Sequence, residues 1–252
     1  MASFEIFDTL PSTQNLCLDR LRAGKPGPGW ILTREQTKGL GRHGRTWVGI
    51  RGNFMASRFE RMTIDVRSVP QLSFVTAVAL YEMLRPMVPD TDAALRIKWP
   101  NDILHKSRKL AGILVQTETT PEPTRLGIVI GVGVNLAAAP IIEAYPTCSL
   151  RDIGADRKID PVVFLHKLDG HLDGVINLWR DKGFGDIARA WLKRAYGRDM
   201  RLSLTHEGAP VSGVLHGLDA FGALQIVADD AQTYTVTGGD IDYAAVKPHA
   251  GV

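Results

Sequence analysis

The sequence predicts an α+β domain followed by a small β-barrel. Helical and strand-like periodicities alternate up to about residue 196. After Gly197 the chain changes to short alternating runs separated by Gly and Asp turn residues, a pattern typical of a small all-β unit. A length of 252 residues suits one large and one small domain. We therefore expect domains at residues 1–196 and 197–252.

Local patterns predict the individual elements. Ser12 and Thr13 are suitable N-terminal caps for a first helix that ends at Gly24. Apolar residues at helical spacing predict three further helices, over 70–87, 161–180 and 184–196. Strand-like runs occupy 4–7, 30–33, 53–60, 95–98, 109–118 and 125–136. The C-terminal unit is expected to hold about five strands, with runs at 200–204, 211–218, 223–227 and 233–237.

Composition excludes several classes of protein. Thirty Lys and Arg residues against 27 Asp and Glu give a net charge of +3, too small to indicate nucleic-acid binding by itself. No apolar run reaches the roughly 18 residues of a membrane span, and the N-terminus lacks the pattern of an export signal. Two cysteines, Cys17 and Cys148, are too few for a disulfide framework. We therefore expect a soluble cytoplasmic protein with reduced thiols.

A glycine-rich loop at 39–52 is the first candidate for chemistry. Residues 39–44 match the dinucleotide pattern G-x-G-x-x-G after a strand, and Glu60 lies where a ribose-binding acid is expected. However, no helical spacing follows, and Arg42 and Arg45 lie within or just after the pattern. An anion-binding loop, with free backbone N–H groups and bidentate guanidiniums, is the better interpretation. Trp47 would cover the bound group; the alternative is a basic surface loop with Trp47 packed on the core.

Two further segments carry polar residues at strand ends. Asn101 and Asp102, in Lys-Trp-Pro-Asn-Asp, suit either turn chemistry or oxygen ligands for Mg²⁺. Lys109 opens an apolar strand, so its ammonium should emerge beside a buried sheet. Asn135 ends a glycine-rich strand at 125–136, where its amide suits a ribose, a phosphate or its own turn.

Together these segments resemble biotin–protein ligases. The resemblance covers most of residues 10–240 and is specific in combination. It rests on Pro-Ser-Thr-Gln-Asn at 11–15, the loop from Gln36 to Trp47, Lys-Trp-Pro-Asn-Asp at 98–102, Arg-Lys-Leu-Ala-Gly-Ile-Leu-Val at 108–115, Gly-Val-Gly-Val-Asn at 131–135 and Gly-Gly-Asp at 238–240. It implies a catalytic domain like that of class II aminoacyl-tRNA synthetases and biotin or lipoate ligases, with a central mixed β-sheet and flanking helices, followed by an SH3-like barrel. The family's helix-turn-helix DNA-binding domain is not expected, because the Ser-Thr motif begins at residue 12.

The resemblance implies an ATP-dependent reaction in two steps. Biotin is activated as biotinyl-AMP and then transferred to a lysine of a biotin carboxyl carrier protein. Lys109 and Arg42 are the implied catalytic residues, and Asp102 the implied Mg²⁺ ligand. The implied biotin-binding residues are Ser12, Thr13, Gln14, Gln36, Leu40, Gly41, Arg42, Lys109 and Gly112. The implied nucleotide-binding residues are Arg42, Arg45, Trp47, Asn101, Lys109 and Asn135.

Some questions stay open at this point. Leu40 replaces an arginine that many family members carry, so one loop cation is absent. A lipoate ligase or octanoyl transferase is expected to share the fold, and the latter would need a nucleophilic cysteine, for which Cys148 is the candidate. A non-catalytic ligand-binding protein is the third interpretation, which the presence of Lys109, Arg42 and Asn135 disfavours. Pairing of sheet edges near 125–136 would give a homodimer.

Overall fold

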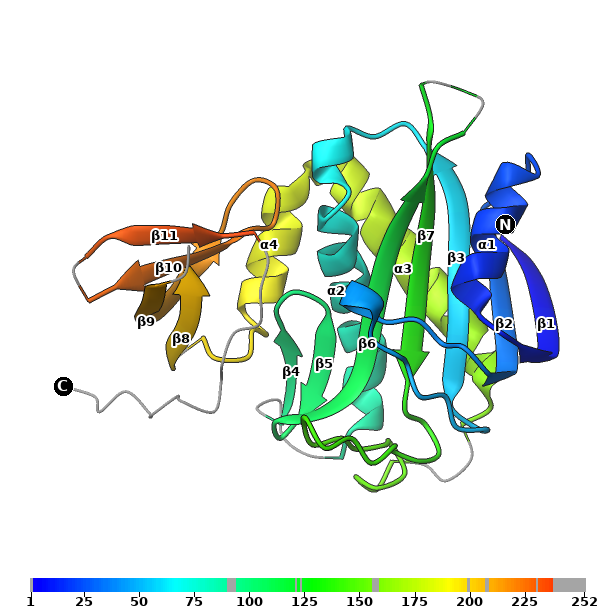
Figure 1. Ribbon diagram of the computed structural model, residues 1–252, viewed down its shortest axis with the longest axis horizontal. Coiled ribbons are helices and arrows are strands. Elements are labelled where there is room, and N and C mark those ends of the chain that lie inside the picture. Colours follow the sequence, from blue (N-terminus) through cyan, green and yellow to red (C-terminus); the bar gives the residue numbers. More distant parts are fainter. Residues whose placement is uncertain are drawn as a thin grey trace.

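A seven-stranded mixed sheet forms the centre of the molecule (Figure 1). The computed structural model describes residues 2–237 except 90–93, 121, 123, 156–158, 199, 207–208 and 230. The strand order is β1-β2-β3-β7-β6-β5-β4; β1 and β2 are parallel and all other neighbours antiparallel. The strands are β1 (Ser3–Leu10), β2 (Gly29–Gln36), β3 (Phe54–Met62), β4 (Leu95–Lys98), β5 (Asp102–His105), β6 (Arg108–Glu118) and β7 (Leu126–Val134).

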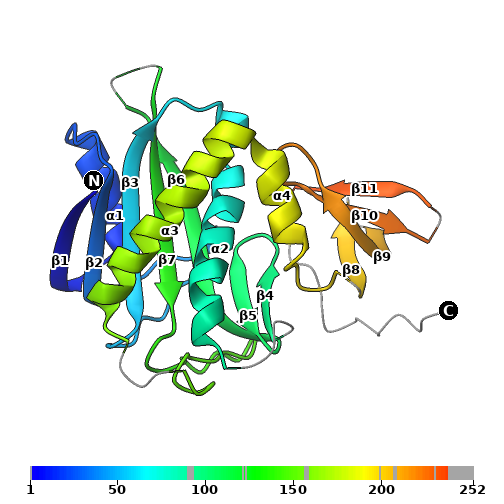
Figure 2. The same ribbon diagram turned by 180° about the vertical axis from the view of Figure 1, so that it is seen from behind.

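Helices cover the two faces of this sheet unequally. α2 (Gln71–Leu84) and α3 (Pro161–Lys182) lie behind it, as Figure 2 shows, with α4 (Phe184–Leu192) continuing toward the C-terminal sheet. The strand residues that face them, such as Phe54, Ala56 and Val132, belong to the main core. On the opposite face only α1 (Thr13–Arg22) packs, over a small cluster that includes Phe59 and Val129. The rest of that face is left for the glycine-rich loop and a cavity.

Local chemistry explains where the helices begin. Ser12 caps α1, its hydroxyl accepting a hydrogen bond from the Asn15 backbone N–H at 3.4 Å. Asp160 caps α3 in the same way, and Pro161 occupies the first helical position. α2 is buried nearly all round, because it lies between the sheet, α3 and α4. None of the helices in the described ranges is long and apolar enough to cross a membrane.

The C-terminal unit is an open sheet in the described residues. Its four strands are β8 (Arg201–His206), β9 (Ala209–Leu218), β10 (Leu224–Ala228) and β11 (Thr233–Val236), in the order β11-β10-β9-β8. The four predicted runs are confirmed as strands, whereas the described part of the sheet does not close into a barrel. The Gly-Gly-Asp motif at 238–240 lies outside the described residues.

One strand of the main sheet was not predicted, and one expectation about the sheet is wrong. Asp102, which the sequence left open between turn chemistry and a Mg²⁺ ligand, begins the unpredicted strand β5, where Lys98 pairs with it across a tight hairpin. The segment 125–136 is not a sheet edge: β7 lies between β3 and β6 and is paired on both sides. The two edges of the sheet are β1 and β4, so residues 126–134 offer no free sheet edge for pairing with a second copy.

Candidate active site

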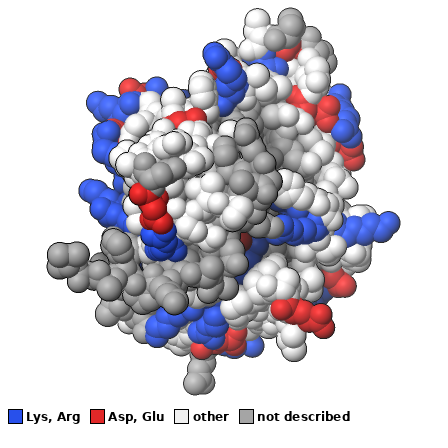
Figure 3. All heavy atoms as spheres, turned by 60° about the vertical axis from the view of Figure 1, so that its left-hand side comes forward, with Lys and Arg blue, Asp and Glu red and all other residues white. Residues whose placement is uncertain are grey.

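A cavity of about 870 Å³ lies on the face of the sheet that α1 leaves uncovered. Its floor is glycine: Gly112 of β6 pairs with Gly133 of β7, and Gly131 pairs with Ser57 of β3. A Cβ atom on Gly131 would lie 2.5 Å from Gln14 Oε1, so larger residues here would fill the space. In the space-filling view, Lys and Arg side chains lie on several sides of a hollow in the surface (Figure 3).

A cluster of neutral polar side chains closes one end of the cavity. Thr13 Oγ1 lies 2.8 Å from Ser57 Oγ, and Ser57 Oγ donates to Gln14 Oε1 at 3.0 Å. Gln36 Oε1 accepts hydrogen bonds from both the backbone N–H and the hydroxyl of Thr13, at 2.9 and 3.1 Å. Thr13, Gln14 and Ser57 are buried. This end is therefore a preorganised set of hydrogen-bonding groups without net charge.

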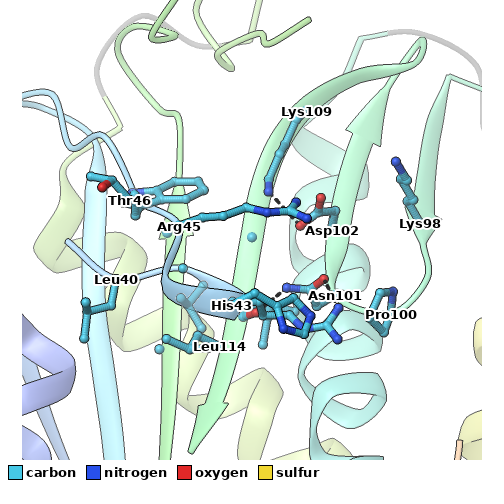
Figure 4. A pocket seen from close by; sticks show the side chains of 18 of the residues that line it. Leu40, His43, Arg45, Thr46, Lys98, Pro100, Asn101, Asp102, Lys109 and Leu114 are labelled. Carbon is cyan, nitrogen blue, oxygen red and sulfur yellow. Dashed lines mark hydrogen bonds and ion pairs between the residues drawn. The ribbon is translucent and has the colours of Figure 1, made fainter. Parts of the chain in front are cut away.

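Charged side chains gather at another part of the cavity wall. Lys109 Nζ, at the start of β6, lies 2.9 Å from Asp102 Oδ1, at the start of β5. Asn101, next to Asp102, donates to Ile113 O at 2.6 Å and accepts a hydrogen bond from Arg42 Nη1 at 3.5 Å. In Figure 4 the side chains of Arg45, Asp102 and Lys109 point into the same part of the cavity.

The glycine-rich loop is a short hairpin laid over the sheet. Leu40 pairs with Thr46, Gly41 N donates to Arg45 O at 2.7 Å, and Trp47 N donates to Gly39 O at 3.0 Å. A three-residue 3₁₀ turn at Arg42–Gly44 forms its tip, with φ of 54° at His43 and 73° at Gly44. No helix follows the G-x-G-x-x-G pattern; the chain runs on to β3 instead. This excludes the dinucleotide-binding turn, which needs a helix N-terminus at that point.

The Trp47 ring packs against the glycine floor. Cβ atoms on Gly133 and Gly112 would come within 2.3 and 3.0 Å of its ring. The Lys109 ammonium lies 5.7 Å from the Trp47 ring centroid and 5.3 Å from that of Tyr145. The indole N–H is buried without a hydrogen-bond partner in the part of the chain that the structure describes.

Most of the predicted site residues meet at this cavity, and two do not. Ser12 is buried as the cap of α1. Asn135 is also buried: its amide donates to Cys148 O at 3.1 Å and accepts from Asn53 Nδ2 at 3.4 Å, beside a second, much smaller pocket. The predicted residues that line the main cavity are Thr13, Gln14, Gln36, Leu40, Gly41, Arg42, Arg45, Trp47, Asn101, Asp102, Lys109 and Gly112.

Two further lining residues escaped the sequence reasoning. Ser57 interrupts the apolar run of a buried strand, a signal that was present but not used. Tyr145 reaches Lys109 because the backbone of residues 146–148 pairs beside β6, with Lys109 N donating to Pro146 O at 2.9 Å and Cys148 N to Lys109 O at 3.0 Å. Nothing in the local sequence predicts that pairing.

Neither cysteine is placed as a nucleophile. Both thiols are free and buried. Burial raises the pKa of Cys148 to about 11, and it raises that of Cys17 further. Among the described residues, no group of three His, Cys, Asp or Glu side chains is arranged to hold a metal ion.

Comparison with known proteins identifies the class. The family model described as Biotin/lipoate A/B protein ligase family matches residues 6–135, just over half of the chain. Those residues include the neutral polar cluster, the glycine-rich loop and Lys109. The chain belongs to this family.

Individual relatives narrow the class to the biotin–protein ligases. A biotin–[acetyl-CoA-carboxylase] ligase of Paracoccus denitrificans is 35% identical over 213 residues, covering 81% of this chain and 86% of the relative. One of Mycobacterium tuberculosis is 30% identical over 235 residues, covering 91% and 85%. A solved biotin protein ligase of Aquifex aeolicus, in complex with biotin and ATP, has a TM-score of 0.77 at 20% identity, covering 98% of this chain and 100% of that chain, and so shows the shared fold. The enzyme is a member of the biotin–protein ligases.

Proposed function

We propose that this enzyme activates biotin with ATP as biotinyl-AMP and transfers the biotinyl group to a lysine of a biotin carboxyl carrier protein. The observation that carries the proposal is one cavity with a neutral polar cluster at one end and Lys109, Arg42 and Arg45 at another. Biotin has a matching division, because its uncharged ureido head and its carboxylate are separated by an apolar chain. The relatives' names and the ligands bound to the Aquifex enzyme support the same substrates.

The ureido head would bind at the neutral cluster. Thr13, Gln14 and Ser57 present hydroxyl and amide groups there, and Gln36 adds a fourth. A ligand that lacks the ureido group, such as lipoate, would not make the further hydrogen bonds that these groups offer, each of which contributes about 0.5–1.5 kcal/mol. The apolar chain would then pass beneath the loop beside the Trp47 ring, which packs on Gly112 and Gly133.

The first step brings two anions together. A biotin carboxylate oxygen attacks the α-phosphorus of ATP; the new C–O–P linkage forms as the bond to the β-phosphate oxygen breaks and pyrophosphate leaves. We assign Lys109 to the carboxylate and the α-phosphate, and Arg42 to the carboxylate and the phosphoryl oxygens. A donor placed where charge develops in the transition state contributes about 3–4 kcal/mol.

The nucleotide would occupy the same charged region. Arg45 is assigned to the triphosphate, Asn101 to the nucleotide, and Trp47 to the cover over both substrates. Leu40 leaves the loop with one cation fewer, although its backbone still pairs with Thr46 in the loop hairpin. The amide of Asn135 is committed to Cys148 O and Asn53, which favours a role in holding residues 146–148 beside Lys109 over direct contact with ATP.

Mg²⁺ is the expected companion of ATP, and the donor set fits it. Asp102 Oδ1 is buried against the cavity and makes no hydrogen bond of good geometry, although it lies 2.9 Å from the Lys109 ammonium. Mg²⁺ commonly binds one protein carboxylate with phosphates and water. Asp102 would hold the ion, which would neutralise phosphate charge there.

In the second step the acceptor lysine attacks as a free amine. Its nitrogen bonds to the carbonyl carbon of biotinyl-AMP, AMP leaves, and the amine proton passes to solvent or to the phosphate. His43 is exposed at the loop tip, and we give it no role as a base. Until the acceptor arrives, the adenylate must be kept from water, which the loop would do.

We also propose the domain division at 196–197, closure of the C-terminal strands as a small barrel, and a cytoplasmic location. The division is supported by residues 194–196, whose backbone pairs with Ile97 of β4 just before the C-terminal sheet begins. The location is supported by the two free thiols.

One experiment separates the candidate functions. Pure protein is incubated with ATP, a carrier domain, and labelled biotin, lipoate or octanoyl thioester. We expect label on the carrier from biotin alone. Transfer from the octanoyl thioester without ATP would contradict the proposal, as would a protein that binds biotin but releases no pyrophosphate. A Cys148→Ala variant should label the carrier at the wild-type rate, since a buried thiol with a raised pKa is a poor nucleophile.

A further inference from the structure

Trp99 connects the candidate active site to the C-terminal sheet. The residue is 4% exposed and lines the cavity, and its indole N–H donates to the Gly222 carbonyl oxygen at 3.2 Å. Gly222 lies in the turn between β9 and β10, 123 residues away in sequence. Because both partners are buried, the bond is shielded from water, and losing it would leave a buried donor or acceptor without a partner.

The turn on the far side of this bond is itself firmly held. Asp219 Oδ1 accepts hydrogen bonds from the backbone N–H groups of Phe221 and Ala223, both at 2.8 Å. Gln71, at the start of α2, donates to Ala220 O at 2.8 Å. Gly222 has φ of +91°, and a Cβ atom there would lie 2.5 Å from the Phe74 ring. Only glycine fits this contact between the turn and α2.

In the sequence, Trp99 directly precedes the segment that forms the charged part of the cavity. Ser73 of α2 donates to Pro100 O at 3.0 Å, which fixes the next residue. Asn101 and Asp102 follow, and they are the partners of Arg42 and Lys109. The bonds therefore form a continuous series from the Gly222 turn through Trp99 to both proposed catalytic cations.

We propose that Trp99 is a positioning residue for adenylate formation. Through its bond to Gly222 O, the C-terminal sheet sets the place of the Asn101–Asp102 segment, and thereby of the Arg42 and Lys109 side chains. This inference rests on the proposed function. It gives the C-terminal sheet a part in the first chemical step, although of the described residues that line the cavity none comes from that sheet.

The test disturbs the Trp99–Gly222 hydrogen bond by one substitution at each partner. Trp99→Phe removes the N–H and keeps an aromatic ring; Gly222→Ala acts outside the cavity. Each has a matched control. Trp30→Phe removes a buried indole bond to Asp169 on the opposite face of the sheet. Gly183→Ala changes a glycine with φ of +78° that has open space around it, between α3 and α4. For each variant, pyrophosphate release, the Kd for biotin and the melting temperature are measured.

We expect Trp99→Phe and Gly222→Ala each to lower the maximal rate of pyrophosphate release by about 10- to 100-fold, as small misplacements of reacting groups do. Biotin affinity should stay within about two-fold, because the neutral cluster is untouched, and the double variant should lose little more than the worse single one. The inference is overturned if the rates match those of the controls, or if rate and biotin affinity fall together with melting temperature. A wild-type protein that releases no pyrophosphate would overturn the proposed function instead.

Discussion

Lys109 and Asp102 form an ion pair across neighbouring strands, with Nζ and Oδ1 2.9 Å apart and both side chains less than one-fifth exposed. Asp102 pairs with Gly112, but the register between β5 and β6 shifts after Ile103, so that Leu104 pairs with Lys109. Because of this shift, the side chains of Asp102 and Lys109 meet above the glycine floor. The aromatic rings of Trp47 and Tyr145 border the ammonium on its other sides. Lys109 is therefore oriented before substrates arrive, and its reorganisation on binding should be small.

Lys109→Ala should abolish adenylate formation and leave the fold intact. Loss of the cation at the carboxylate–phosphate junction should lower pyrophosphate release by about 10²- to 10³-fold. The measurement is a coupled pyrophosphate assay with circular dichroism as the check on folding. The control is Lys106→Ala. Lys106 is exposed and lies two residues before the start of β6, so this variant should keep the wild-type activity. Near-normal pyrophosphate release by a folded Lys109→Ala protein would remove Lys109 from the mechanism.

Arg42→Ala should weaken retention of biotinyl-AMP more than it affects folding. The guanidinium reaches Asn101 at 3.5 Å from a half-buried loop position, and a charge-assisted bond to the adenylate would contribute about 1.5–3 kcal/mol. The bound intermediate should therefore leave at least about ten times faster. Its half-life is followed by rapid filtration with labelled biotin. Arg34→Ala, exposed and outside the cavity, should leave the half-life unchanged; equal half-lives for all three proteins would count against the loop as a clamp.

The strands and helices of the main domain follow from short-range patterns, which is why most of them could be predicted. The β4 run at 95–98, the cap at Ser12 and the helical spacing from residue 161 are local signals, and the structure confirms the strand and the two helices that they predict. β5 was missed because Asn-Asp after Pro is also a good turn, and the choice between turn and strand depends on pairing with β6. The position of β7 in the sheet is likewise a long-range property that no local pattern encodes.

The candidate site was predicted in its residues but not in its arrangement. Motif positions name Thr13, Arg42 and Lys109 equally, yet only the fold assigns Thr13 to the neutral cluster and Lys109 to the charged part of the cavity. Asn135 carries the same kind of motif signal and is nevertheless occupied by backbone contacts. Ser57 interrupts an apolar run, but only the strand register shows that it faces the cavity, and Tyr145 reaches the cavity through backbone pairing that no local pattern encodes.

Gly131→Ala should reduce biotin affinity selectively. The new methyl group would lie 2.5 Å from Gln14 Oε1, so Gln14 would have to move away from Ser57 and the neutral cluster would be disrupted. Overpacking of this kind costs about 1–3 kcal/mol, which corresponds to a roughly 5- to 150-fold rise in Kd for biotin. Isothermal titration calorimetry measures it, while the rate at saturating biotin should change less.

Gly170→Ala is the matched control for that substitution. Gly170 lies within α3 with nothing within 4 Å of the added methyl group, so biotin affinity should be unchanged. The free energy of unfolding should rise by about 0.5–1 kcal/mol, because alanine favours the helix. A loss of biotin affinity in both alanine variants would mean that the Gly131 effect does not come from the neutral cluster.

Cys148 should make unfolding sensitive to alkaline pH. Burial raises the pKa of its thiol from an ordinary value of 9.0 to about 11, so the folded protein holds this proton more tightly than the unfolded chain does. The stability contributed by the neutral thiol is therefore complete below pH 9.0 and is lost as the pH rises toward about 11. Urea unfolding from pH 8 to 11 measures the free energy of unfolding in wild type and in Cys148→Ala. The variant should be less stable by a constant amount below pH 9 and should lose less stability above it. Parallel curves for the two proteins would show that the Cys148 thiol does not titrate differently in the folded and unfolded states.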